Sequence, residues 1–372
     1  MSLDWSDICV VGVGTSEYGT FPETNAHGLA LTALSAAIED CGIAWEAIDG
    51  LVVNRAGSYQ KLGESLGMNP RWSLQLETSG RMSGASIVEA AAALRCGLTN
   101  AVALVYGNDG RSRRVNYGGS QRASSDPFAV WGFTSPGAFH AMMFRRHAER
   151  YGTTIRHLGE VAVAFRYHAS LNPLAVQRDL MTLDDHAQSR LVCEPLRLLD
   201  YCQINDGGVA LIMTTMDRAR DLRKVPIRLA GIGMSDHFAR SSFPPDDFWF
   251  GALQASSQQS FDMAGVRPDE VDALMVYDNF TPPVLFSLEG LGYCAPGESG
   301  SFVEDGALRL GARLPTNTNG GHLSESYMQG WSLNVEAVRQ LRGECAERQV
   351  RNAKIVHYAS ATPRCISLVY SQ

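Results

Sequence analysis

Lysine is scarce in this sequence. Lysine and arginine together number 32 in the 372-residue chain, but only Lys61, Lys224 and Lys354 are lysines. A Schiff-base mechanism requires a lysine inside the active site. Lys61 follows the loop sequence GSYQ, Lys224 lies in an expected linker and Lys354 begins an expected strand, so none of them is well placed. The sequence therefore argues against Schiff-base chemistry.

Clustered metal ligands are missing as well. The eight cysteines are scattered singly without any C-x-x-C pair, and the nine histidines are not spaced with carboxylates in the way that metal sites require. We therefore expect neither a metal site nor a disulfide framework. The absence of paired cysteines favours a reducing compartment, and we expect a cytoplasmic protein.

Long apolar runs and an excess of positive charge are also absent. No run approaches the ~18 residues that a membrane helix needs, and the N-terminal sequence MSLDWSDICVVG lacks the pattern of a secretory signal. The net charge is −7, whereas a nucleic-acid-binding face is basic. With 45% hydrophobic and 19% charged residues, the chain has a globular composition, and we expect no nucleic-acid or membrane partner.

An internal repeat is present. Four segments of the first half match four segments of the second half in the same order. The pairs are VVGVGTSE (10–17) with LAGIGMSD (229–236), CGIAWEAIDGLVVN (41–54) with AGVRPDEVDALMVY (264–277), EAAAALR (89–95) with EAVRQLR (336–342), and NAVALVYG (100–107) with NAKIVHYA (352–359). Four matches in register indicate a duplication with modest insertions.

Each half has the pattern of alternating strands and helices. An apolar strand ends in a glycine turn at Gly12 and Gly14, or at Gly231 and Gly233, and amphipathic helices then alternate with further apolar strands. Such alternation favours parallel-type sheets that are covered on both faces. The sequence predicts an α/β fold in which two βαβαβαββ halves, residues 1–222 and 223–372, stack as α/β/α/β/α layers. An inserted helical loop domain at about 110–200 is expected to cover the mouth of the site.

Two turns precede Ala-rich helices at equivalent positions of the repeat, TSGRMSGAS (78–86) and SESYMQGWS (324–332). We expect the turns to approach each other and to direct two helix N-termini at a shared site, where N–H groups favour developing negative charge. The glycines of the longer stretch TNTNGGHLSESYMQGW (316–331) would let a substrate lie against the backbone. The alternative is a pair of tight glycine turns without chemistry.

The duplication and the segments NPLAVQRDLMTLDDHAQSRLVCEPLRLLDYCQINDGGVAL and VYDNFTPPVLFSLEGLGYC resemble the thiolase superfamily over essentially the whole chain. The likeness is greatest to its sterol-carrier/lipid-transfer-type branch. The nucleophilic cysteine of the family's C-x-[ST]-G turn falls on Arg81, the G-H-P turn on SYM around Tyr327, and the H-D-C-F segment on YDNF beginning at Tyr277. Each group needed for acyl-enzyme thiolysis is replaced, so we do not expect Claisen condensation through a cysteine thioester.

The resemblance implies a different reaction. The pattern is similar to the thiolase-like aldolases of steroid side-chain degradation, which cleave a branched β-hydroxyacyl-CoA by retro-aldol chemistry. Tyr277 and Tyr327 are then the expected proton-transfer residues, in either order of base and acid, and Asp278 is expected to brace the turn after its strand. By the same resemblance we expect no cofactor beyond the CoA of the substrate, a homodimer, and a small partner built from an OB-fold and a zinc ribbon.

The remaining site residues follow from the needs of this chemistry. A free phenol has a pKa of about 10, so a tyrosine base requires a local positive field, which Arg81 or His322 could supply. Backbone N–H groups near Ser83 and Gly84, together with Asn279 or His322, could hold the enolate oxygen.

Two other functions stay open at the level of sequence. One is a thiolase-like acyltransferase subunit with an unrecognised nucleophile, for which Cys345 and Cys365 are candidates. The other is a non-catalytic acyl-CoA-binding or lipid-transfer protein. A tyrosine at a strand end also commonly packs with a single hydrogen bond and takes no part in chemistry.

Overall fold

The structure is a computed structural model that describes residues 5, 7–76, 82–115, 131, 133, 135–236, 245–362 and 364–372. Arg81, one of the predicted site residues, lies outside the described residues. None of the helices in the described part of the chain is long and apolar enough to cross a membrane.

The first half alternates strands and helices in the predicted order. Its main elements are β1 (Ile8–Thr15), α1 (Ala26–Cys41), β2 (Gly50–Asn54), α2 (Tyr59–Leu66), β3 (Trp72–Gln75), α3 (Met82–Arg95), β4 (Ala101–Asn108) and β7 (Gly207–Thr215), followed by a short α7 (Met216–Ala219). Local signals set the ends of α1: the Asn25 side chain accepts the Gly28 N–H at its start, and Gly42 ends it with a φ of 69°.

The second half repeats this order with one difference. Its elements are β8 (Ile227–Asp236), α8 (Phe250–Ala264), β9 (Ala273–Val276), α9 (Thr281–Gly290), α10 (Ser299–Glu304), α11 (Gly321–Ser324), α12 (Trp331–Arg342), β10 (Ile355–Ser360) and β11 (Arg364–Ser371). Among its described residues it has no strand equivalent to β3. Leu51 of β2 pairs with Ser73 of β3. On the corresponding side of β9, the equivalent Leu274 forms only an isolated bridge with Thr316.

The missing strand has a local cause. Next to Thr316, the side-chain amide of Asn317 bonds to both the N–H and the C=O of Val276, at 2.8 Å each, and so occupies groups that a third strand would pair with. The chain then leaves the sheet, since Asn317 has a φ of 48° and Gly320 a φ of 104°. The stretch predicted as an active-site turn therefore starts where the second half loses its edge strand.

The nine strands form one sheet in the order β3-β2-β4-β7-β1-β8-β11-β10-β9. Read outward from its centre, the first half runs β1-β7-β4-β2-β3 and the second half runs through the equivalent strands β8-β11-β10-β9. The halves join through a short antiparallel ladder in which Cys9 lies opposite Arg228 and Val10 opposite Ile227. This mirrored order confirms the predicted duplication.

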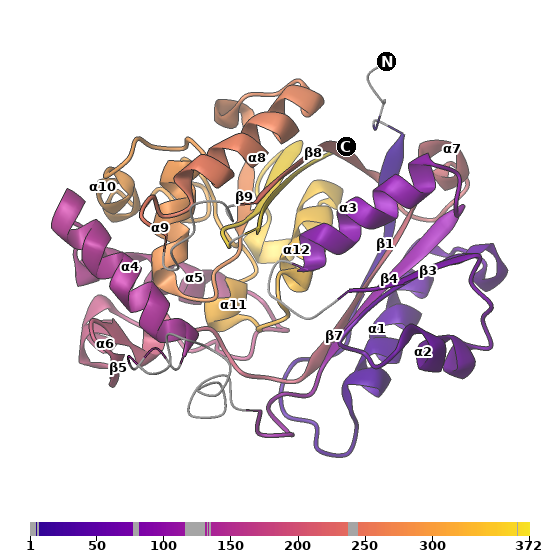
Figure 1. Ribbon diagram of the computed structural model, residues 1–372, viewed down its shortest axis with the longest axis horizontal. Helices are drawn as coiled ribbons and strands as arrows, with labels where there is room; N and C mark the ends of the chain where they lie inside the picture. The colour runs from indigo at the N-terminus through magenta and orange to yellow at the C-terminus, as the bar shows by residue number, and fades with distance from the viewer. Residues whose placement is uncertain are drawn as a thin grey trace.

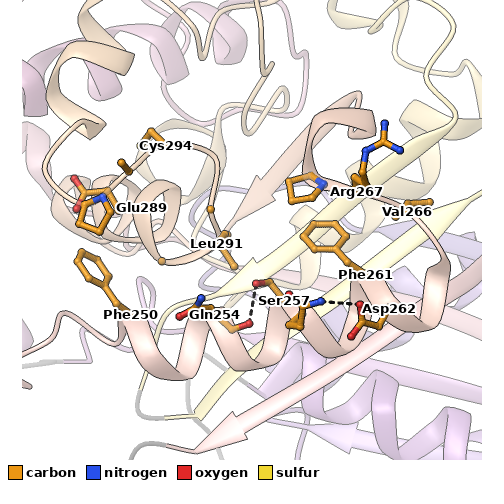
Figure 2. Close-up of a pocket in the computed structure, with 16 residues that line it drawn as sticks. Phe250, Gln254, Ser257, Phe261, Asp262, Val266, Arg267, Glu289, Leu291 and Cys294 are labelled. Carbon is orange, nitrogen blue, oxygen red and sulfur yellow. Dashed lines mark hydrogen bonds between the residues drawn. The ribbon is translucent and has the colours of Figure 1, made fainter.

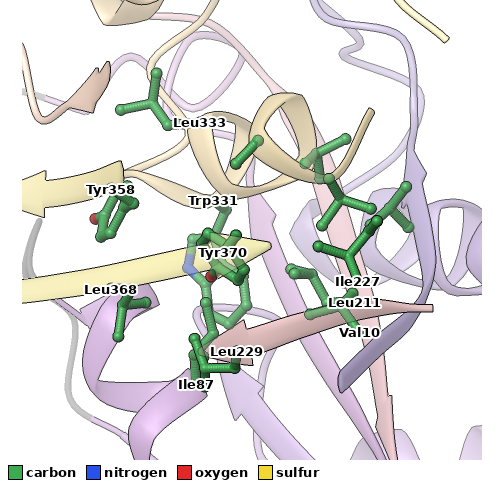
Figure 3. Close-up of a cluster of buried hydrophobic side chains, with 14 of the residues drawn as sticks. Val10, Ile87, Leu211, Ile227, Leu229, Trp331, Leu333, Tyr358, Leu368 and Tyr370 are labelled. Atoms are coloured by element: carbon green, nitrogen blue, oxygen red, sulfur yellow. The ribbon is translucent and has the colours of Figure 1, made fainter. Parts of the chain in front are cut away.

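The five predicted layers are α1, the first-half strands, the central helices, the second-half strands and α8. Three hydrophobic cores lie between them. One core lies between α1 and the outer face of the first-half strands, and another between α8 and the outer face of the second-half strands. The third contains side chains from both halves together with α3 and α12, which form the central layer (Figures 1 and 3). Representative members of this third core are Val10, Ile87, Leu104, Met275, Leu333 and Leu368.

The inserted segment between β4 and β7 contains α4 (Pro136–Tyr151), α5 (Ile155–Ser170), α6 (Leu183–Gln188), β5 (Leu191–Cys193) and β6 (Leu196–Arg197). It packs against the second half: Phe144 and Phe165 belong to the same core as Phe286 of α9. The exact boundaries of the two halves and the covering role of this segment stay predictions.

The starts of α3 and α12 meet at the centre of the molecule. Ser83 and Gly330 are equivalent in the repeat, and a Cβ on Gly330 would lie 2.5 Å from both the Ser83 Oγ and the Tyr358 hydroxyl. Gly330 has a φ of 87°, and Trp331, which follows it, stacks on Tyr106 with ring centroids 5.9 Å apart. The predicted approach of the two turns is therefore present from residue 82 onward.

Replacing Gly330 tests this contact. Both Gly330→Ala and Gly343→Ala place a side chain at positive φ, at the two ends of α12, but a Cβ on Gly343 would meet nothing within 4 Å. We expect Gly330→Ala to lower the free energy of unfolding by about 1–3 kcal/mol more than Gly343→Ala, because only the first forces the central layer apart. Denaturant unfolding of both variants measures the difference, and equal losses would contradict the packing described.

Candidate active site

Tyr277 stands at the carboxyl end of β9. Its N–H donates to the Ala359 carbonyl at 2.9 Å, which continues the parallel pairing with β10, and its side chain is 1% exposed. The next residue, Asp278, is fully buried. These residues leave the sheet at the edge where α/β proteins usually place their sites.

Asp278 joins this strand end to the polar turn. Its carboxylate accepts the N–H of His322 at 2.9 Å and the N–H of Leu323 at 3.2 Å, in the first turn of α11. The described hydrogen bonds of the Asp278 side chain therefore brace α11 and not, as predicted, the turn after its own strand. A charged acceptor at the start of a helix is favourable. Here the backbone N–H groups replace the water that burial removes from the carboxylate.

The glycines of the turn face protein groups. A Cβ on Gly321, whose φ is 61°, would lie 2.1 Å from an Asp278 oxygen, and a Cβ on Gly320 would lie 2.5 Å from the Ala169 Cβ. These glycines let the turn pack closely on Asp278 and on α5. Their expected contact with a substrate stays a prediction.

The two predicted tyrosines meet in the turn. Their hydroxyl oxygens are 2.9 Å apart, within hydrogen-bond distance, and their rings lie edge to face with centroids 6.5 Å apart. Tyr277 is buried and Tyr327 is half-buried. Burial, followed by the adjacent Tyr327, raises the pKa of Tyr277 well above its ordinary value. Tyr277 therefore holds its proton more firmly than an exposed tyrosine does. Either hydroxyl can be the donor of the bond between them.

His322 packs against both phenols, with ring centroids 4.7 Å from Tyr277 and 5.4 Å from Tyr327. Its Nε2 accepts the Gly330 N–H at 2.8 Å, so this nitrogen carries no proton. Its Nδ1 lies 2.9 Å from the Asp278 Oδ1, but the alignment falls short of a regular hydrogen bond, and we treat the contact as electrostatic. Both ring nitrogens face protein groups, which favours a positioning role for His322.

The remaining predicted residues lie around this pair in different ways. The Ser83 Oγ is bonded to the Tyr358 hydroxyl at 2.9 Å, and Gly84 packs on Ile366. Both belong to the first turn of α3, where the helix itself offers no acceptor for backbone N–H groups. The Asn279 Oδ1 is buried and has no hydrogen-bond partner among the described residues, so this side chain keeps hydrogen-bonding capacity for a ligand.

Two residues near the phenols were not predicted. The Asn205 Oδ1 accepts the Tyr327 N–H at 2.8 Å, and the Cys202 N–H donates to the Asn279 carbonyl at 3.0 Å. Burial, and then Asp278, raise the pKa of the Cys202 thiol. In the same loop, the Asp206 carboxylate accepts the N–H groups of Phe21, Arg111 and Ser112.

The lysines lie away from this arrangement. Lys61 and Lys354 are exposed on the surface, and Lys224 pairs with Glu344 at 2.6 Å. The described residues likewise contain no group of three metal-ligating side chains.

A separate groove of about 640 Å³ runs between α8 and residues 289–296 (Figure 2). Neither phenol lines it. Several of its polar groups are already paired, since the Ser257 Oγ donates to the Gln254 carbonyl and Gln258 donates to Asp262, while Glu289 accepts from Ser299. The tyrosine pair, where two hydroxyl groups converge, is therefore the better candidate site.

Comparisons with known proteins agree with this geometry. Residues 235–362 match the family model described as thiolase C-terminal domain-like. The chain is 35% identical over 353 residues to a steroid side-chain-cleaving aldolase of Thermomonospora curvata, covering 90% of each chain. The chain belongs to the thiolase superfamily. Its place is in the sterol-carrier-type branch that contains these aldolases, as the resemblance implied.

Two further relatives support the same branch. A 17-hydroxy-3-oxo-4-pregnene-20-carboxyl-CoA lyase of Mycobacterium tuberculosis is 32% identical over 351 residues, covering 90% of this chain and 91% of the relative. The solved structure of an Ltp2-ChsH2(DUF35) aldolase superposes with a TM-score of 0.92 at 32% identity, covering 100% of this chain and 99% of the other.

A buried carboxyl group lies two residues before Tyr327. Glu325 accepts hydrogen bonds from Asn172 at 2.9 Å and from Asn319 at 2.5 Å, and so ties the inserted segment to the turn. Burial, and then the neighbouring Glu336, raise the pKa of Glu325 to about 7.

The stability of the protein should depend on this group. Because the folded-state pKa lies above the unfolded value of about 4.5, the folded state binds more protons between these values, and stability falls as the pH rises through about 7. Glu325→Gln cannot titrate and should lose less stability than the wild type between pH 5 and pH 8. Thermal melting at both pH values tests this, with the exposed Glu64→Gln as control. A wild-type pH dependence in Glu325→Gln would contradict it.

Proposed function

We propose that the protein is a carbon–carbon lyase that cleaves a bulky β-hydroxyacyl-CoA by a retro-aldol reaction, producing a ketone and a short acyl-CoA. The observation that carries this proposal is the pair of phenol oxygens 2.9 Å apart at the carboxyl end of β9. The names of the relatives support the reaction class, since they are an aldolase and a lyase of CoA thioesters or steroid side chains.

The environments of the tyrosines suggest their roles. Tyr277 is buried, and its raised pKa makes it a poor base. Tyr327 is half-buried and lies within hydrogen-bond distance of Tyr277, so it is the tyrosine that can touch a substrate. We assign Tyr327 as the base and Tyr277 as the group that stabilises its phenolate. Arg81 and the N-terminus of α12 remain the proposed sources of positive field.

The reaction balances with these two groups. Tyr327 takes the proton of the β-hydroxyl, the oxygen electron pair forms the ketone C=O, and the Cα–Cβ bond breaks. Its electron pair moves into the thioester to form an enolate. The proton held by Tyr327 then adds to Cα, which gives the short acyl-CoA and restores the phenolate. No cofactor other than the CoA of the substrate is needed.

The enolate oxygen requires hydrogen-bond donors. Asn279, next to Asp278, can donate through its side-chain NH2 group, and Ser83 and Gly84 present first-turn N–H groups of α3. Donors fixed before the reaction stabilise developing negative charge without reorganisation. We propose these residues as the enolate site, with His322 and Asp278 positioning the turn.

The bulk of the substrate is inferred from the relatives. One is named for steroid side-chain cleavage and another for a pregnene carboxyl-CoA, so we propose a steroid or similarly large branched acyl chain. A ketone product requires a β-carbon with two carbon substituents, which such side chains have.

Thiolase-type acyl transfer is less well supported. It needs a reactive thiolate, whereas burial raises the pKa of Cys365 to about 12 and also raises that of Cys345. Both cysteines are fully buried. A carrier without catalysis would not require a pair of hydrogen-bonded phenols.

Removing either hydroxyl tests the reaction. We expect Tyr277→Phe and Tyr327→Phe to lower kcat by about 10²–10⁴-fold, because general acid–base groups contribute that much. Mass spectrometry of ketone and acyl-CoA products from a series of β-hydroxyacyl-CoAs measures the loss. Tyr293→Phe is the matched control: Tyr293 is also buried in the second half, but its hydroxyl is bonded to His357. Full turnover by both Tyr277→Phe and Tyr327→Phe would contradict the proposal.

The partners are a separate proposal. The solved aldolase relative carries two components in its name, and we propose that this chain also works with a small protein built from an OB-fold and a zinc ribbon, as a homodimer. Purification from the native host should then recover such a protein in equal amount, and light scattering should give two copies of each chain. A monomer that is fully active alone would contradict this.

A further inference from the structure

The two tyrosines are held in different ways. Tyr277 continues β9, the edge strand of the sheet, and its backbone is fixed by pairing with β10. Tyr327 lies on the turn between α11 and α12, which the strand ladder does not reach. Its phenol must nevertheless stay at 2.9 Å from that of Tyr277. Something outside the sheet has to set the position of this turn.

Asn205 makes that contact. Its Oδ1 accepts the backbone N–H of Tyr327 at 2.8 Å, across a sequence separation of 122 residues. Asn205 is 1% exposed and belongs to the loop that leads into β7 of the first half. The bond therefore spans from the first half to the residue of the second half that carries the proposed base.

Asn205 is itself held from two sides. Its Nδ2 donates to the Asp206 carbonyl at 3.0 Å, which orients the amide so that the oxygen faces Tyr327. Its own carbonyl accepts from the Asn108 Nδ2 at 2.7 Å, at the carboxyl end of β4. The following Asp206 is anchored to the turn at residues 111–112. The acceptor is thus placed by the first-half sheet.

The neighbouring loop residues hold the rest of the turn in the same way. The Gln203 N–H donates to the His322 carbonyl at 2.9 Å, and its side chain donates to the Leu323 carbonyl at 2.8 Å. These contacts fix α11, while Asn205 is the described contact of this loop with Tyr327 itself. Proton transfer between phenols, and to a substrate, depends steeply on distance, so a displacement of about 1 Å can cost about 100-fold in rate.

We propose that Asn205 is a positioning residue for the reaction: its side-chain carbonyl fixes the backbone of Tyr327 and so sets the distance between the two phenols. This inference rests on the proposed function. It assigns a catalytic task to the first half, which supplies neither tyrosine.

The test is Asn205→Ala in two backgrounds. In the wild type we expect kcat to fall about 10–100-fold with KM changed by less than about threefold, because the amide faces the protein and not the substrate. In Tyr327→Phe the same change should lower the residual rate by less than about threefold, because the group that Asn205 positions is already gone. Asn205→Asp keeps an acceptor for the Tyr327 N–H but loses the donor to the Asp206 carbonyl, so it should recover only part of the loss.

Matched controls separate positioning from folding. Asn100→Ala removes an amide bonded to Asp49 at the opposite end of the first-half strands and should leave kcat unchanged. Thermal melting identifies variants that do not fold. If Asn205→Ala is one of them, Asn205→Ser carries the test, because its hydroxyl is one bond too short to reach the Tyr327 N–H.

The outcomes are distinguishable. Wild-type kcat in folded Asn205→Ala or Asn205→Ser overturns the inference while leaving the tyrosine mechanism intact. An equal loss in the Tyr327→Phe background also overturns it, because Asn205 would then act on something else. Full turnover in Tyr327→Phe alone would remove the proposed function and this inference with it.

Discussion

The buried carboxylate of Asp278 is the contact on which the rest of the site depends. It follows Tyr277 at the end of β9 and accepts the N–H groups of His322 and Leu323, so the strand and the turn that carries Tyr327 share one anchor. A buried carboxylate is costly unless fixed dipoles replace its water, and the first turn of α11 supplies them. Gly321 is required for the same reason, because any side chain there would displace the carboxylate. The position of the two phenols thus depends on the hydrogen bonds that stabilise the buried Asp278 carboxylate.

The duplication builds the scaffold, but both phenols come from one half. In the repeat Asn54 stands where the second half has Tyr277, so the first half has no equivalent pair. The asymmetry begins at Thr316, where a single bridge replaces a third strand and the chain is released from the sheet. The released segment forms the polar turn. The first half instead contributes the start of α3 and the loop at Asn205, which meet this turn from the other side.

The two phenols lie in different environments. Burial of Tyr277 favours its neutral form, while Tyr327 is half-buried and within hydrogen-bond distance of it. Under the proposed function, this difference gives two chemically identical groups separate roles. His322, which packs on both rings, has its Nε2 occupied by the Gly330 N–H and its Nδ1 directed at Asp278. These contacts favour a positioning role for His322 in the proposed reaction.

The sequence by itself determined the duplicated α/β layers, the strand end at Tyr277 and the pairing of Tyr277 with Tyr327. Repeats, periodicity and motif positions can be read along the chain without knowing how its segments pack. It also marked Asp278 and His322, although not what they bond to. Only the tertiary structure decided that Asn205 reaches Tyr327 across 122 residues, that Gly330 lies against Ser83, and that the glycines of the turn face Asp278 and α5. It also decided that the second half lacks an equivalent of β3, because a single isolated bridge leaves no periodic pattern in the sequence. Contacts between distant segments depend on how whole layers pack, and no local pattern encodes that packing.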